Sequence, residues 1–176
     1  MNKKVWMLVL VLAAVLLLTS ISLVAAQPGT HGVIACDLDI TYDGTHWSGE
    51  IFGEGCEIKG AIEFYAVPEE YDCPPGNTMH FVETFIIMPD AGGSIEGKNW
   101  GIWNMHNGKF RAHGWVLDTD GYPELLGSQY HEMGVTSTTD VTQIPIYAPD
   151  GKMKMVPGNR PVDSVGKTVP QHPCFP

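Results

Sequence analysis

The feature that most constrains the fold is the alternation of apolar and polar residues, interrupted by turns that contain glycine. Successive side chains of a β-strand point to opposite faces, so an alternating stretch predicts a strand with one buried face. Two such stretches, residues 34–42 and 45–52, flank Asp43-Gly44. A two-residue Asp-Gly turn predicts a hairpin in which Tyr42 faces Thr45. Because no sustained helical periodicity follows residue 26, we expect an all-β chain.

The strands are expected to follow one another as a meander. Seven are predicted, at residues 34–42, 45–52, 56–67, 79–88, 94–106, 109–117 and 125–137, with an eighth near 141–147. This series favours a small antiparallel β-barrel, with a β-sandwich or jelly roll as the alternative. Residues 27–147 are therefore assigned to the barrel. Residues 148–176 are assigned to an extended proline-rich tail, because proline cannot donate to a sheet ladder.

The first 26 residues have the pattern of an export signal. Two lysines precede an apolar run over residues 5–18, and Val24-Ala25-Ala26 gives the small residues of a cleavage site. An uncleaved anchor is the alternative, because the apolar stretch is close to the ~20 residues that span a bilayer. The signal predicts a secreted, extracellular or periplasmic protein whose mature chain has no membrane span.

The charge balance limits the partners. Without Lys3 and Lys4 the chain has 8 basic and 20 acidic residues, a net charge of about −12 with histidine neutral. An acidic protein is repelled by nucleic acid and by anionic membrane surfaces. We therefore expect neither as a partner.

Four cysteines in an exported chain predict two disulfides. Cys36 and Cys56 share the parity of the buried faces of their strands, which favours their pairing and leaves Cys73 to bond Cys174. The other two pairings remain open. Zinc is the rival interpretation, but the sequence has no Cys-x-x-Cys step.

The segment 101–115, GIWNMHNGKFRAHGW, contains the main candidate binding site. A two-residue turn at Asn107-Gly108 predicts that Trp103 faces Ala112. One face of this hairpin then consists of glycines and apolar residues, and we interpret it as core. The other face provides the candidate ligand-binding residues Trp100, Asn104, Arg111, His113 and Trp115. The alternative is an outer face that the proline-rich tail covers.

Three further candidate ligand-binding residues are Glu83, His131 and Glu132. Glu83 lies in a stretch that is apolar on both faces, as in a strand that lines a cavity. Neighbours on a strand point to opposite faces, so His131 and Glu132 cannot enter one site without a bulge. Neither the histidines nor the calcium-like residues 118–121 have a diagnostic metal spacing. The sequence therefore predicts no metal and no cofactor.

Four motifs in order, FVETF at 81–85, GSIEG at 93–97, GW at 114–115 and LLGSQYHEMG at 125–134, resemble the eight-stranded barrels of the allene oxide cyclase and dirigent type. The resemblance covers about a third of the chain. It implies a lumen open at one end and trimeric association. It carries over no catalytic residue.

These features support three hypotheses. The first is a binding or surface-associated protein without chemistry of its own, whose partner is a small molecule or a glycan. The second is a barrel isomerase or cyclase that uses His113, Arg111 and Glu83 or Glu132 inside the lumen. The third is a surface protein that assembles into homo-oligomers through its tail. No Gly-x-Ser-x-Gly nucleophile motif is present, and catalytic residues stay unassigned.

Overall fold

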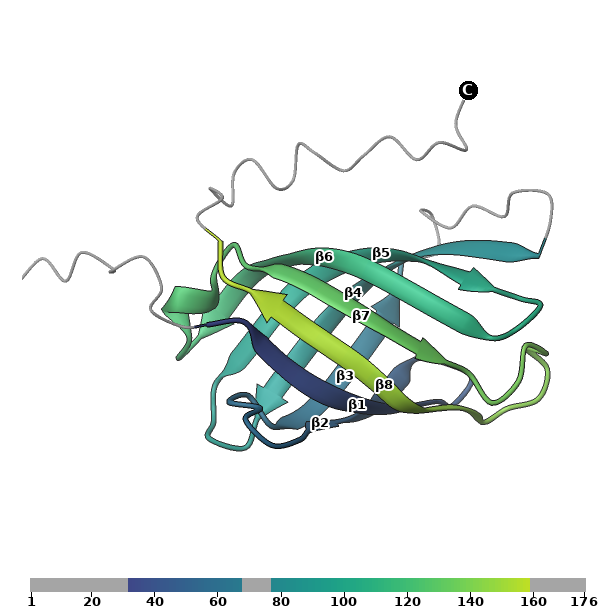
Figure 1. Cartoon of the computed structure of the whole chain (residues 1–176), viewed down its shortest axis with the longest axis horizontal. Coiled ribbons are helices and arrows are strands. Elements are labelled where there is room, and N and C mark those ends of the chain that lie inside the picture. Colours follow the sequence, from purple (N-terminus) through teal and green to yellow (C-terminus); the bar gives the residue numbers. More distant parts are fainter. Residues whose placement is uncertain (1–31, 68–76, 159–176) are drawn as a thin grey trace, which may run out of the picture.

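The computed structural model describes residues 32–67 and 77–158, which form one closed antiparallel β-barrel (Figure 1). Each strand pairs with the next along the chain, and the last strand closes on the first. The strands are β1 (Ile34–Tyr42), β2 (Trp47–Phe52), β3 (Gly60–Ala66), β4 (Thr78–Pro89), β5 (Ser94–Asn104), β6 (Lys109–Asp120), β7 (Gln129–Val135) and β8 (Ile146–Val156). The predicted all-β barrel is thus confirmed, and the sandwich alternative is excluded.

The first hairpin is paired two residues away from the predicted register. Tyr42 pairs with Trp47 rather than with Thr45, so the loop has four residues. The Asp43 carboxylate causes the longer loop, because its Oδ1 accepts hydrogen bonds from the backbone N–H groups of Thr45 (2.7 Å) and His46 (3.1 Å).

The β5–β6 hairpin shows the same shift for the same reason. Trp103 pairs with Phe110 rather than with Ala112. The Asn104 Oδ1 atom accepts hydrogen bonds from the backbone N–H groups of His106 (2.9 Å) and Asn107 (3.3 Å), which closes a four-residue loop. A shift of two residues leaves every side chain on its predicted face.

The eighth strand begins later than predicted, since residues 141–145 form turns, and it extends to Val156, which corrects the assignment of residues 148–156 to a tail. These residues lie in β8, which pairs with both β7 and β1. Pro149 is tolerated because the β1–β8 register shifts between Leu38 and Ile40, opposite this residue. Beyond it Met153 and Met155 are buried, whereas Lys152 and Lys154 are exposed, which is strand alternation.

One end of the barrel is filled with apolar side chains. The Cys36–Cys56 disulfide is formed, as predicted, and the segment after β2 buries Ile58 beside it. The core at this end includes Cys36, Leu38, Ile51, Cys56, Ile58, Ile62, Phe85, Ile87, Ile95, Val116, Leu125, Tyr130, Met153 and Met155. We call this half the plugged end.

Three sequence predictions fall outside the described residues. They are the export signal at 1–26, the pairing of Cys73 with Cys174, and the part of the tail that follows residue 158. Within residues 32–67 and 77–158, no helix is long and apolar enough to cross a membrane.

Candidate binding cavity and its buried carboxyl pair

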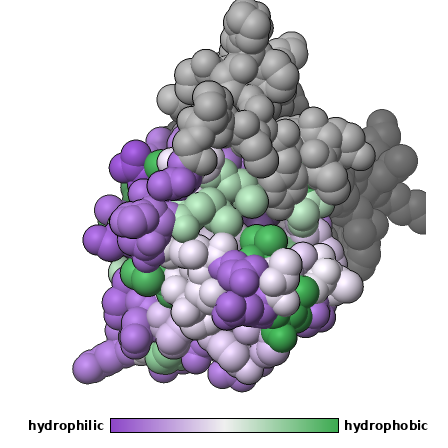
Figure 2. Space-filling model, turned by 90° about the vertical axis from the view of Figure 1, so that its right-hand side faces the viewer, coloured by the Kyte–Doolittle hydropathy of each residue, from purple (hydrophilic) through white to green (hydrophobic). Residues whose placement is uncertain are grey.

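The opposite end of the barrel contains a cavity of about 590 Å³. It lies where β1, β3, β5 and β7 end and the other four strands begin. Figure 2 looks onto this end and shows green, apolar side chains among the pale ones at its surface. Val141 and Ile144, which are 47% and 49% exposed, line the rim, so the cavity reaches the molecular surface. We call this half the open end.

The wall of the cavity is mainly aromatic. It includes Tyr42, Trp47, Phe64, Phe81, Trp103 and Phe110. These rings fit because the lumen-facing positions opposite them on the sheet are small. A Cβ atom added to Gly101 would lie 2.5 Å from the Phe81 ring and 2.6 Å from the Ala112 Cβ, closer than real contacts allow. Large rings beside glycine and alanine are what the narrow interior of a small barrel requires.

Two carboxyl groups, Glu83 and Glu132, also line the cavity, where it meets the plugged end. Glu83 shares the inward face of β4 with Phe81 and Phe85, and Glu132 shares the inward face of β7 with Tyr130. They are only 7% and 4% exposed. Carboxyl groups are rarely buried in proteins unless another group pairs with them.

Glu132 is held by hydrogen bonds at both oxygens. The Tyr130 hydroxyl donates to Oε2 at 2.7 Å, and the Asn99 side-chain amide donates to Oε1 at 3.1 Å. Glu83 differs: no side chain in the described part of the chain donates a hydrogen bond to its carboxyl group. Asn99 is its cross-strand neighbour, and the buried Asn99 Oδ1 atom has no hydrogen-bond donor among the described residues.

Burial makes both carboxyls weak acids. It raises the pKa of Glu132 to about 7, although the bonds from Tyr130 and Asn99 act in the opposite direction. Burial raises the pKa of Glu83 well above its usual range, and the charge of Glu132 raises it further. The pKa of Tyr130 is raised by burial first and by Glu132 second. Near neutral pH Glu132 therefore titrates, and Glu83 is a weaker acid than an ordinary glutamate.

The other sequence-predicted candidates lie on the outer face of the barrel, where Trp115 is nevertheless buried, with 9% of its surface exposed. Trp100, Asn104, Arg111, His113, Trp115 and His131 alternate along their strands with the inward positions. Trp100 and His113 are in edge-to-face contact, with ring centroids 4.5 Å apart, and His113 pairs across strands with His131. The pKa of each of these histidines is lowered, by burial first and then by neighbouring charged groups.

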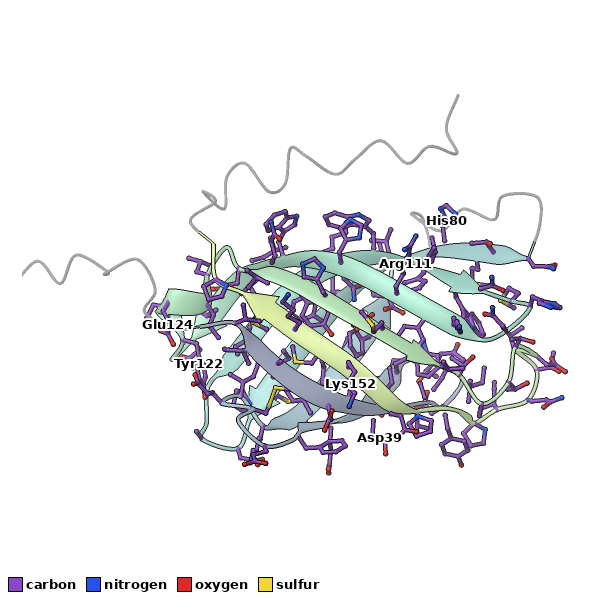
Figure 3. The ribbon with its side chains drawn as sticks, viewed as in Figure 1. Asp39, His80, Arg111, Tyr122, Glu124 and Lys152 are labelled. Atoms are coloured by element: carbon purple, nitrogen blue, oxygen red, sulfur yellow. A yellow bond between two sulfur atoms is a disulfide. The ribbon has the colours of Figure 1, made fainter. Side chains whose placement is uncertain are left out.

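The hypothesis of a barrel isomerase or cyclase placed His113 and Arg111 inside the lumen, and this placement is wrong. Both side chains are exposed, because they flank the inward-facing Ala112 and cannot share its face. Arg111 is labelled in Figure 3. Only Glu83 and Glu132 of the candidate residues enter the lumen. The eight candidates therefore separate into a lumenal pair and an outer group.

Sequence reasoning missed Asn99, Tyr130 and the aromatic wall as parts of the site. Strand parity could have found the first two, because Asn99 has the parity of Gly97 and Gly101, and Tyr130 has that of Glu132. Periodicity assigns the aromatic residues to core, since it does not distinguish a filled interior from a hollow one.

In the described ranges no group of three or more His, Cys, Asp or Glu side chains could hold a metal ion. No protein-family model, curated protein or solved structure matches this chain. The resemblance to allene oxide cyclase and dirigent barrels thus stays a prediction, and the function has to be inferred from the cavity.

Proposed function

We propose that this chain is a binding protein that encloses a small molecule with an apolar body in the open end of its barrel. The observation that carries this proposal is the aromatic-walled cavity of about 590 Å³. Pockets that bind small molecules typically have volumes of about 300–1,000 Å³, apolar linings and few polar groups. The cavity has this character, because its polar groups are few beside its aromatic and aliphatic ones.

The architecture favours a small apolar ligand over a glycan. A glycan needs many hydrogen-bonding partners, whereas this cavity offers few polar side chains, among them Glu83, Glu132 and Thr136. The plugged end leaves one route of entry, through the rim. We further propose that the protein acts outside the cell, a location supported by the Cys36–Cys56 disulfide and the signal-like first 26 residues.

The test is binding of Nile red, a neutral apolar dye whose fluorescence increases away from water. We expect saturable binding to the full-length chain, which Ala66→Trp weakens at least tenfold because residue 66 lines the cavity. Ala61→Trp is the matched control, since both alanines are exposed on β3 but Ala61 lies on the outer face and does not line the cavity. Absence of saturable binding, or equal loss in both variants, would contradict the proposal.

The carboxyl pair favours a second candidate function, acid–base catalysis on a bound apolar substrate. A buried carboxyl with a pKa of about 7 is suited to proton transfer at neutral pH. We expect such an enzyme to exchange the α-protons of 2-tetralone in deuterated water, as followed by NMR, and Glu132→Gln to abolish that exchange. Exchange that persists unchanged in Glu132→Gln would exclude this candidate.

A further inference from the structure

We propose that the ligand is an organic amine, whose ammonium group binds the Glu83–Glu132 pair while its apolar body fills the aromatic cavity. This inference rests on the proposed function, because it specifies the ligand of the same cavity. It commits to one chemical class, a protonated amine with an aromatic or aliphatic body.

The sign of the charged groups in the cavity favours a cation. Glu83 and Glu132 are its only acidic lining residues in the described part of the chain, and no lysine or arginine lines it there. The one basic lining residue among those described is His46, at the rim, and its Nδ1 atom lies 3.6 Å from the Asp43 carboxylate. An anionic ligand would therefore place its charge beside the Glu132 carboxyl, which is partly ionised near neutral pH, without a lysine or arginine in the described lining to balance it.

Hydrogen-bonding capacity is left over at the inner end of the cavity. Glu83 is more than nine-tenths buried, lines the cavity and receives no hydrogen bond from the described residues. Because this carboxyl lines the cavity, a ligand that supplies donors can form hydrogen bonds with it and would gain affinity there. An ammonium group has three donors. Glu83 and Glu132 can accept them together, whereas an alcohol offers only one.

The aromatic wall of the cavity can interact favourably with both the ammonium group and the apolar body of such a ligand. Ring faces attract cations through the negative charge of their π-systems. The same rings bury the apolar body of the ligand, and the removal of apolar surface from water favours binding. A cavity that combines aromatic rings with carboxyl groups is therefore matched to an apolar amine.

Binding of an ammonium group should release a proton. Burial keeps Glu132 partly protonated near neutral pH, and a bound cation would favour its carboxylate form. The titratable groups that face Glu132 are Glu83 on β4 and Tyr130 on β7, and both have raised pKa values. From the flanking strands β6 and β8, its cross-strand partners are the uncharged Ala112 and Met153.

The experiment compares three probes of one shape by isothermal titration calorimetry with the full-length chain. The probes are 2-(1-naphthyl)ethylamine, 2-(1-naphthyl)ethanol and 1-naphthylacetate, which are cationic, neutral and anionic at pH 7. We expect the amine to bind at least tenfold more tightly than the alcohol, and the anion to bind most weakly. Titrations at pH 6 in buffers of different ionisation enthalpy should show that the amine releases close to one proton.

Variants assign the preference to the carboxyl pair. Glu132→Gln and Glu83→Gln should each reduce the preference for the amine over the alcohol to less than threefold while alcohol binding persists. Persisting alcohol binding also shows that the variants are folded. Glu96→Gln, which removes an exposed carboxyl from the outer face of β5, should keep the full preference.

The outcomes separate the two proposals. Equal affinities for amine and alcohol, or tighter binding of the anion, would overturn the amine inference and leave the proposed function intact. Binding of none of the three probes would overturn both. A preference for the amine that survives in both glutamine variants would also overturn the inference, because the cation would then be recognised elsewhere.

Discussion

At the scale of single residues, the two lumenal carboxyls link the stability of the barrel to pH. The pKa of Glu132 is about 7 in the folded protein, above the ordinary value of 4.5. Between these values the folded chain keeps a proton that the unfolded chain has lost. Stability from this group is therefore complete below about pH 4.5 and is lost as the pH rises towards 7.

We predict that Glu132→Gln removes much of this dependence. Each pKa unit corresponds to about 1.4 kcal/mol, so the variant should gain roughly 3 kcal/mol relative to the native chain between pH 4.5 and 7.5. The hydrogen bonds can be kept, because Asn99 can reverse its amide to accept from the new glutamine. Urea unfolding across this pH range measures the difference.

The two histidines His113 and His131 also make stability depend on pH, but their effect cancels in the difference in stability between the native chain and Glu132→Gln. The pKa values of His113 and His131 are lowered, so their contribution is present above about pH 6.5 and is lost as the pH falls. This contribution has the opposite pH dependence and is common to both proteins. A stability difference that stays constant between pH 4.5 and 7.5 would contradict the pKa assigned to Glu132.

The sequence identified both carboxyls as candidates but did not place them together. Their inward orientation follows from parity with Phe85 and Tyr130, which is sequence information. Their proximity depends on how β4 and β7 lie across the lumen, and these strands are not paired with each other. Contacts across a barrel interior are therefore beyond what alternation along single strands can predict.

At the scale of elements, close approach of strands and rings fixes the shape of the interior. A Cβ atom added to Gly97 on β5 would lie 2.2 Å from the Phe85 ring and 2.3 Å from the Trp115 carbonyl oxygen. The carbonyl belongs to the backbone of β6 and cannot move without disturbing the ladder. Gly97 also adjoins the register shift between β5 and β6.

We predict that Gly97→Ala destabilises the protein by about 3 kcal/mol, at the upper end of the range for overpacked interiors. Gly32→Ala is the control, because no heavy atom lies within 4 Å of the added Cβ. Both substitutions change the unfolded chain in the same way, so their difference isolates the native contact. Equal unfolding midpoints of the two variants in urea would contradict the conclusion that Phe85 and β6 leave no space for a methyl group at residue 97.

Elements are predicted well in type and less well in register and extent. Alternation fixes which face of a strand is buried, but Asp43 and Asn104 each lengthen a turn by hydrogen bonds to their side chains. A rule based on the Asp-Gly or Asn-Gly pair alone misses such bonds. The sequence underestimates β8 because Pro149 suggests a break, whereas the bulge beside it needs no ladder bond from that residue.

At the scale of the whole molecule, the barrel is divided into a plugged end and an open end. The Cys36–Cys56 bond lies in the core of the plugged end, and its two cysteines are 20 residues apart in sequence. Closing a loop of that length in the unfolded chain is worth about 3 kcal/mol in the chain-entropy model. We predict that Cys36→Ala with Cys56→Ala lowers the free energy of unfolding by about this amount, as measured in urea. An unchanged free energy would contradict it.

The division also predicts that stability and binding respond to different substitutions. Neither Cys36 nor Cys56 lines the cavity, whereas Glu132 does. The double alanine variant should therefore bind Nile red and 2-(1-naphthyl)ethylamine within about twofold of the native chain, at a temperature where both proteins are folded. Glu132→Gln should do the reverse at pH 7.5, with higher stability and a weaker preference for the amine, because a buried group kept for binding costs stability. Titrations of both variants beside their urea curves test the division. Amine affinity that falls in the double alanine variant as far as in Glu132→Gln would show that the plug and the cavity are coupled through the barrel wall.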